Sequence, residues 1–197
     1  AGFVWFQGWN DMVDGSTYPN RGKPGSYDAY SEVLTHFIRD VREDLDAPNL
    51  PFVIGVMGAG GPVDAYPKEK QRYAGIHQTF RDAMAAPAKR PEFQGNVAAV
   101  QTEKYWDMPL EALKQRETKF KAKKDELNQE MKDGKLTRAE GAAAIEKLYN
   151  EEFSERELVL LRESTSNAEY HYLGSAKIMA QIGKGFAEAM GELMKKQ

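Results

Sequence analysis

Two short polar stretches of this 197-residue chain carry side chains that suit acyl-transfer chemistry. The first contains Gly8 and Asn10 and directly follows the apolar run FVWF at positions 3–6. A glycine N–H and an asparagine amide just past a strand can donate hydrogen bonds to an oxyanion, and such a donor is worth about 3–4 kcal/mol in acyl transfer. The alternative interpretation is that Asn10 only caps a turn.

The second stretch contains His171, which lies between Tyr170 and Tyr172 in the polar segment STSNAEYHYLGSAK. A histidine in such a segment can act as a general base. The alternative is an ordinary surface histidine. The other two histidines, His36 and His77, fall inside predicted amphipathic helices, where we expect structural or solvated roles.

Two glycine-containing stretches resemble ligand-binding motifs but depart from them. In GVMGAGGP, Pro62 and Asp64 follow where a phosphate-binding helix would begin, so neither a dinucleotide fingerprint nor a P-loop is present. In QEMKDGKLTRAE, the first and third positions of a calcium loop would be Gln129 and Met131, which are poor ligands. We therefore expect no cofactor and no resident metal.

Composition excludes several other classes of protein. The formal net charge is −3, with no basic stripe, so nucleic acid is not an expected partner. The chain has no cysteine, which rules out disulfides and thiolate catalysis. The sequence contains no apolar run approaching the roughly 20 residues of a membrane span, so no membrane partner is expected.

The pattern of apolar residues predicts an α/β fold. Strands are expected at 3–6, 51–58 and 95–102, with amphipathic helices at 27–45 and 69–85 between them. Helix-length crossovers make such strands parallel, so we expect a partial doubly wound sheet of about three strands. Ligands bind at the carboxyl ends of such strands, which here are followed by the loops 8–15, 58–66 and 102–108.

A charged segment interrupts this pattern. Residues 110–163 are rich in charge and carry only a thin apolar stripe, which predicts an inserted helical hairpin. Gly134 suits a helix C-cap, and Thr137 with Glu140 has capping-box spacing. The α/β domain would then comprise residues 1–109 and 164–197, the latter ending in a final helix.

The motif WFQGWND at positions 5–11 resembles the third conserved block of SGNH hydrolases, which have a flavodoxin-like fold. The motif YHYLGSAK at 170–177 resembles their fifth block, and the closest similarity is to sialate O-acetylesterase-like carbohydrate esterases. The resemblance covers residues 3–107 and 164–197. It implies a serine hydrolase that removes acetyl groups from sugars, without a cofactor, in an extracellular or periplasmic location.

Carried over by position, the resemblance gives roles to several residues. Gly8 and Asn10 would be oxyanion donors, and His171 would be the base that activates a serine. The substrate pocket would be lined by four further residues of the two motifs: Gln7, Trp9, Asp11 and Tyr170.

Two features depart from the family pattern. The block Gly-x-Ser-Asn, which supplies the nucleophile, is absent, and Ala168 stands where the family's acid precedes the histidine by three residues. Asn167 and Glu169 are the nearby substitutes, and Glu169 would orient His171 if the segment bends suitably. We therefore expect a C-terminal piece of a longer esterase, or a sheet that a second chain completes.

Two other functions remain open from the sequence. A non-catalytic carbohydrate-binding protein of the same fold would stack sugar rings on its aromatic residues: Trp5, Trp9, Tyr170 and Tyr172. An interaction protein would instead bind its partner through the charged segment 110–163.

Overall fold

A parallel sheet organises the first part of the molecule. In the computed structural model, which describes residues 1–196, its strands are β1 (Phe3–Trp5), β2 (Phe52–Val56) and β3 (Val97–Gln101). They pair in the order β1-β2-β3, and Val53 is opposite Val4 on one side and Ala98 on the other. The predicted α/β architecture with a parallel sheet is confirmed, although the first strand ends at Trp5 rather than Phe6.

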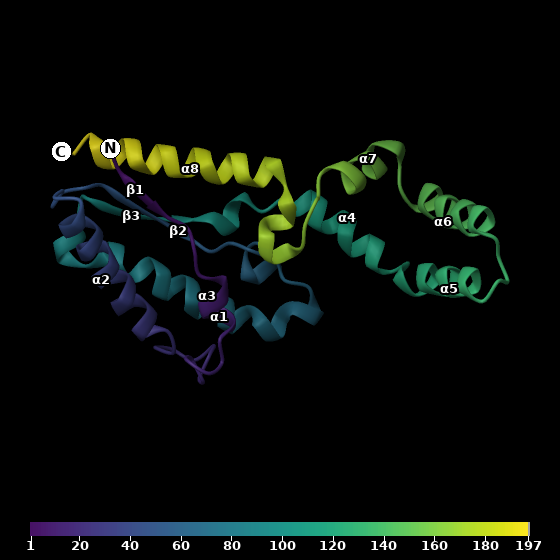
Figure 1. Cartoon of the computed structure of the whole chain (residues 1–197), viewed down its shortest axis with the longest axis horizontal. Helices are drawn as coiled ribbons and strands as arrows, with labels where there is room; N and C mark the ends of the chain where they lie inside the picture. Colours follow the sequence, from purple (N-terminus) through teal and green to yellow (C-terminus); the bar gives the residue numbers. More distant parts are fainter. Residues whose placement is uncertain (197) are drawn as a thin grey trace. The chain divides into compact units, whose positions relative to one another are not determined.

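Helices cover both faces of this sheet (Figure 1). One face packs against α2 (Asp28–Asp44) and α3 (Gln71–Ala85), whose Ile38 and Phe80 join the main apolar core. The other face packs against α8 (Ala176–Met194), whose Phe186 lies in a cluster with Val53. Because β2 is central and covered on both faces, all five of its residues are buried.

The loop expected at residues 8–15 contains a short helix, α1 (Trp9–Val13). Its one buried residue is Met12, whose backbone N–H donates to the carbonyl of Gly8 at 3.0 Å. The Tyr27 hydroxyl donates to the carbonyl of Met12 at 2.7 Å. The polar composition of this segment predicted a loop, and packing against the core made one turn of it helical.

Single turns of 3-10 helix also occur in the connections. One of them replaces the polar loop expected before the final helix. They are η1 (Val63–Ala65), η2 (Lys68–Lys70), η3 (Ala86–Lys89), η4 (Pro91–Phe93), η5 (Thr102–Tyr105) and η6 (Glu169–Gly174).

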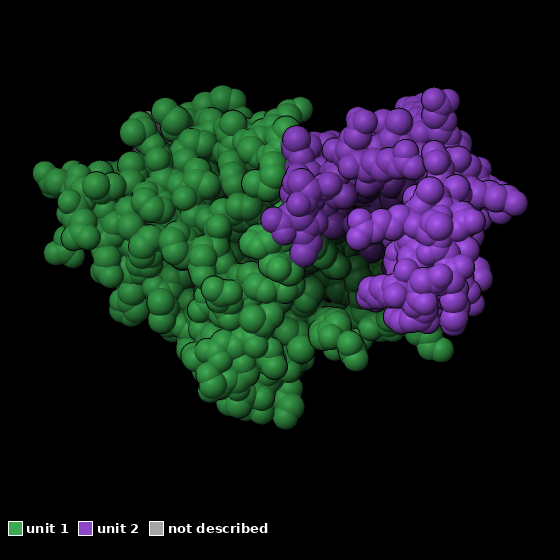
Figure 2. Space-filling model, turned by 45° about the vertical axis from the view of Figure 1, so that its right-hand side comes forward, with its two compact units in different colours: residues 1–106, 169–172, 178–197 green, residues 107–168, 173–177 purple. Residues whose placement is uncertain are grey.

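The chain divides into two compact units, which Figure 2 shows in different colours. The first comprises residues 1–106, 169–172 and 178–197, and the second comprises residues 107–168 and 173–177. The predicted insertion, residues 110–163, lies within the second unit.

The second unit is helical. Within residues 107–168, all of which the structure describes, there are four α-helices rather than the two of the expected hairpin: α4 (Met108–Thr118), α5 (Lys121–Lys132), α6 (Arg138–Glu152) and α7 (Glu155–Glu163). The turn between α5 and α6 has the expected form, with Gly134 at φ 73° and a capping box between Thr137 and Glu140. A second capping box, between Ser154 and Glu157, begins α7 and so separates this helix from α6.

Candidate active site

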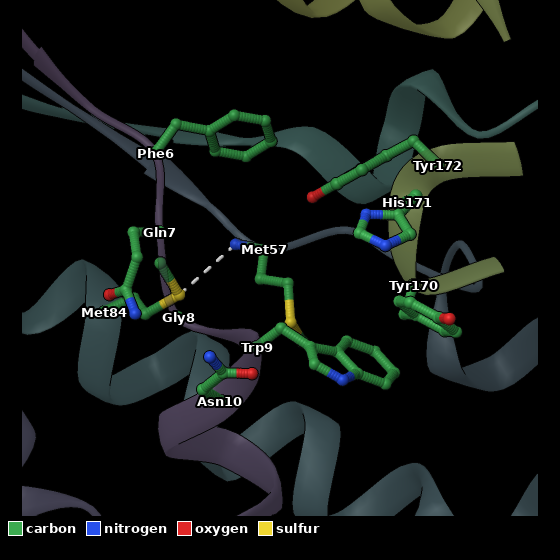
Figure 3. Close-up of a pocket in the computed structure, with 10 residues that line it drawn as sticks. All are labelled: Phe6, Gln7, Gly8, Trp9, Asn10, Met57, Met84, Tyr170, His171 and Tyr172. Carbon is green, nitrogen blue, oxygen red and sulfur yellow. Dashed lines mark hydrogen bonds between the residues drawn. The ribbon is translucent and has the colours of Figure 1, made fainter. Parts of the chain in front are cut away.

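A cleft of about 450 Å³ lies at the carboxyl ends of β1 and β2. Its walls come from four places in the sequence: the residues after β1 and into α1, the end of β2, α3, and η6. The lining residues, all drawn in Figure 3, are Phe6, Gln7, Gly8, Trp9, Asn10, Met57, Met84, Tyr170, His171 and Tyr172.

Gly8 joins β1 to α1 and is buried. A Cβ atom at this position would lie 2.8 Å from Cε1 of Phe80 and 3.3 Å from Cε of Met84. The chain therefore rests directly on α3, and a larger residue would push it into the cleft. This close approach places Asn10, on the first turn of α1, at the cleft wall.

Aromatic rings form one side of the cleft. The ring centroids of Trp9 and Tyr170 are 5.6 Å apart at an interplanar angle of 34°, and those of Tyr170 and His171 are 4.4 Å apart. Tyr170 is 47% exposed, so its ring is available to a ligand. His171 is also exposed and lines the same cleft as Asn10 and Gly8.

Two of the predicted site carboxylates have other partners. The Glu169 carboxylate accepts a hydrogen bond from Lys70 at 2.7 Å, and it is this lysine rather than His171 that pairs with it in the described part of the chain. Its role as the acid that orients His171 stays a prediction. Asp11 accepts from the Gln7 amide at 3.0 Å and is not among the residues that line the cleft.

A buried cation holds the loop that follows β2. Arg81, on α3, is almost completely buried and donates to the carbonyls of Met57, Ala59 and Gly61 at 2.8, 3.1 and 3.0 Å. These carbonyl oxygens and the Tyr66 hydroxyl, at 3.3 Å, accept from Nε and Nη2 of Arg81, since a buried guanidinium needs hydrogen-bond partners. Arg81 thus fixes the position of Met57 in the cleft.

His77 lies beside this arginine. Its Nδ1 is hydrogen-bonded to the Tyr66 hydroxyl at 2.7 Å, and the ring is buried. Burial lowers the pKa of His77 to about 4, with Arg81 and Lys70 contributing in the same direction. The expectation of a structural role is therefore supported by its surroundings, and His36 is exposed on α2.

Two further features bear on cofactors and on location. Across residues 1–196, the structure brings together no group of three or more His, Asp or Glu side chains that could hold a metal ion. None of the helices described is both long enough and apolar enough to cross a membrane.

Three lining residues were not identified from the sequence: Phe6, Met57 and Met84. Met57 is the first residue after β2, so the rule that ligands bind at the carboxyl ends of strands could have identified it. Met84 falls inside the amphipathic helix predicted at residues 69–85, where nothing local marks it as a site residue. Its Sδ accepts a hydrogen bond from the Met57 N–H at 3.3 Å, and only tertiary packing reveals this contact.

Comparison with known families gives one match. Residues 1–108 match the model of the family described as carbohydrate esterase, sialic acid-specific acetylesterase. Neither a curated protein nor a solved structure matches the chain.

Proposed function

The chain belongs to the carbohydrate esterase family of sialic acid-specific acetylesterases, and from this membership we propose that it carries the base and the oxyanion donors of a site that removes acetyl groups from sugars. The observation that supports the proposal is the position of three residues. Gly8, Asn10 and His171, which are up to 163 positions apart in the sequence (171 − 8), line one cleft.

The proposed reaction is an acyl transfer to a serine. The serine Oγ attacks the acetyl carbonyl carbon while His171 takes the hydroxyl proton, and the carbonyl oxygen becomes an oxyanion. The Asn10 amide and the backbone at Gly8 would stabilise that oxyanion. The carbonyl then re-forms, the bond to the sugar oxygen breaks, and His171 returns the proton to the leaving alcohol. Water hydrolyses the acetyl-serine by the same steps.

The serine of the proposed reaction lies outside the ten residues that line the cleft, since none of these is a serine. β1 is the outer strand of the sheet as described, and its Val4 is 44% exposed. A further parallel strand on this edge would end beside Gly8 and Asn10. We infer that the serine lies on such a strand, which would belong to another segment or a second chain.

A second function is favoured by a specific observation. Trp9 and Tyr170 form an aromatic surface at a cleft that contains no serine, and sugar rings bind to such surfaces by stacking. Such an aromatic surface is sufficient for a protein that binds carbohydrate without catalysing a reaction. The family description names sialic acid, so O-acetylated sialic acid is the first ligand to test for either function. An extracellular or periplasmic location also stays a prediction.

The test is acetate release from O-acetylated sialic acid by the protein expressed from its complete reading frame, whatever its extent. His171→Ala should lower kcat by about 10²–10⁴-fold, because it removes the general base. The matched control is His36→Ala, which removes the exposed imidazole on α2 and should leave kcat within about twofold.

Two results would overturn parts of this proposal. An active enzyme in which His171→Ala has no effect would overturn the assignment of the base. No hydrolysis, together with sugar binding that Trp9→Ala abolishes, would establish the carbohydrate-binding function instead.

A further inference from the structure

The turn that carries His171 has an unusual backbone. The next two residues, Tyr172 and Leu173, have φ values of 53° and 60°, in the left-handed region that non-glycine residues rarely adopt. Such a conformation persists only where surrounding contacts hold it. Backbone hydrogen bonds to Ala168, Ser166 and Asn167 hold Leu173, and Tyr172 has contacts of its own within its unit.

Tyr172 is anchored through its hydroxyl group. The hydroxyl oxygen accepts from the Gly58 N–H at 2.9 Å and lies 3.2 Å from Oγ1 of Thr102. Oγ1 of Thr102 in turn donates to the carbonyl of Val56 at 2.7 Å. These residues stand at the carboxyl ends of β2 and β3, so one side chain ties η6 to two strands.

The directions of these hydrogen bonds follow from the available protons. The Val56 carbonyl can only accept, so the single hydroxyl proton of Thr102 points to it. The Tyr172 proton must then point to Oγ1 of Thr102, which leaves the Tyr172 oxygen to accept from Gly58. Every member is satisfied in a continuous chain: Gly58 N–H to Tyr172, Tyr172 O–H to Thr102, and Thr102 O–H to the Val56 carbonyl.

This chain of hydrogen bonds is buried. Tyr172 is 9% exposed, and its ring contacts those of Phe6 and Trp106, at centroid distances of 5.4 and 6.2 Å. A Cβ atom on Gly58 would lie 2.1 Å from the Glu103 backbone nitrogen. Only glycine fits there, and its N–H donates to the Tyr172 hydroxyl at 2.9 Å.

We propose that the Tyr172 hydroxyl is a positioning group for His171: it locks the strained turn to the ends of β2 and β3 and so holds the imidazole in the cleft. The inference rests on the proposed function, in which His171 is the base. It adds a residue whose hydroxyl acts through the neighbouring His171.

The experiment uses NMR of the 197-residue chain, with ¹³C-labelled histidine and ¹⁵N-labelled backbone. The chain has three histidines, which give three resolvable ring signals. Tyr172→Phe keeps the ring and removes only the hydroxyl. We expect the His171 ring signal to move by more than its line width and the Gly58 amide to exchange with solvent about tenfold faster, as the loss of one hydrogen bond predicts.

The matched control is Tyr66→Phe, which also removes one buried hydroxyl from a tyrosine that contacts the loop after β2. It should move the signal of His77, its hydrogen-bond partner, and leave that of His171 unchanged. A second pair of variants acts on the other end of the chain of hydrogen bonds. Thr102→Val should shift His171 as Tyr172→Phe does, whereas Thr102→Ser, which keeps the hydroxyl, should restore the wild-type signal.

An unchanged His171 signal in both Tyr172→Phe and Thr102→Val would overturn the proposal. So would equal movement of His77 and His171 in Tyr172→Phe, because that would show general loosening. These measurements need no catalysis, so they separate the two proposals. If the His171 ring signal moves in Tyr172→Phe but the protein has no esterase activity, only the proposed function is refuted. In an active protein, we expect Tyr172→Phe to lower kcat about tenfold with little change in KM.

Discussion

The backbone of Gly8 lies against the ring of Phe80, so closely that a Cβ atom added to the glycine would be 2.8 Å from Cε1 and 2.9 Å from Cζ. The ring belongs to α3 and is completely buried in the core. A position that the family resemblance connects with oxyanion binding is therefore also a packing constraint.

Gly8→Ala should destabilise the first unit by about 1–3 kcal/mol, because an inserted methyl group in a packed core forces its neighbours apart. Urea unfolding followed by tryptophan fluorescence measures this unit alone, since all three tryptophans lie within it. The control is Gly183→Ala on α8, where an added Cβ meets nothing within 4 Å. That change should leave stability unchanged or raise it by up to about 1 kcal/mol, because alanine favours a helix. Equal effects at the two sites would contradict the packing argument.

Arg81→Met should lower the free energy of unfolding by about 3 kcal/mol or more. It removes the guanidinium donor from the buried carbonyls of Met57 and Gly61, and each group left unsatisfied costs about 1–3 kcal/mol. The Ala59 carbonyl loses the same donor but still accepts from the Tyr66 hydroxyl at 3.3 Å. The same fluorescence-monitored urea titration gives the value. Arg39→Met is the control, because the Arg39–Glu92 ion pair is exposed to solvent and its loss should hardly move the midpoint. A small effect for Arg81→Met would show that water replaces the guanidinium.

The buried His77 should make stability depend on pH. Its pKa is about 4 in the folded state, against the ordinary histidine value of 6.5 in the unfolded chain, so between these values the unfolded chain binds more protons. Stability is therefore complete above about pH 7 and falls as the pH decreases towards 4, by about 2 kcal/mol between pH 7 and pH 5. Urea midpoints at the two pH values measure the loss. His77→Gln should remove this component and His36→Gln should retain it; a slope unaffected by His77→Gln would refute the assignment.

Asn10→Ala should reduce the rate of acetyl transfer by about 10²–10³-fold in kcat if its amide stabilises the oxyanion. The measurement is acetate release by the protein from the complete reading frame, at saturating substrate. Asn20→Ala removes an exposed asparagine of the loop after α1 and should have no effect. A change in KM alone would indicate that Asn10 binds the sugar in the ground state and does not act on the transition state.

A site residue can be predicted from the sequence when its neighbours in the sequence fix its position, but not when residues far away in the sequence do. β2 and β3 could be located because short apolar runs bounded by Pro, Gly and Asn are strong local signals. Gly8 and Asn10 could be singled out because they follow such a run directly. His171 could be identified as a candidate from its neighbours, but nothing local indicated which groups would surround it.

Local patterns were insufficient wherever long-range packing determined the conformation. The segment at Trp9–Val13 reads as a loop and forms a helix, because Met12 is buried in the core and Tyr27 holds its carbonyl. The sequence before α8 predicts a polar loop, but the segment forms a turn with a left-handed backbone at Tyr172. The Tyr172 hydroxyl is hydrogen-bonded there to Gly58 and Thr102, which lie 114 and 70 positions away in the sequence. Glu169 stands near His171 in the sequence but pairs with Lys70.

The sequence by itself thus determined the α/β order of elements, the family and the types of reactive side chain, since local apolar periodicity and short motifs indicate these features. Only the tertiary structure decided that Asn10 and His171 share a cleft and that Arg81 and Tyr172 hold its walls. The physical reason is that buried polar groups must find partners wherever the fold places them, and the identity of those partners depends on contacts between residues far apart in the chain.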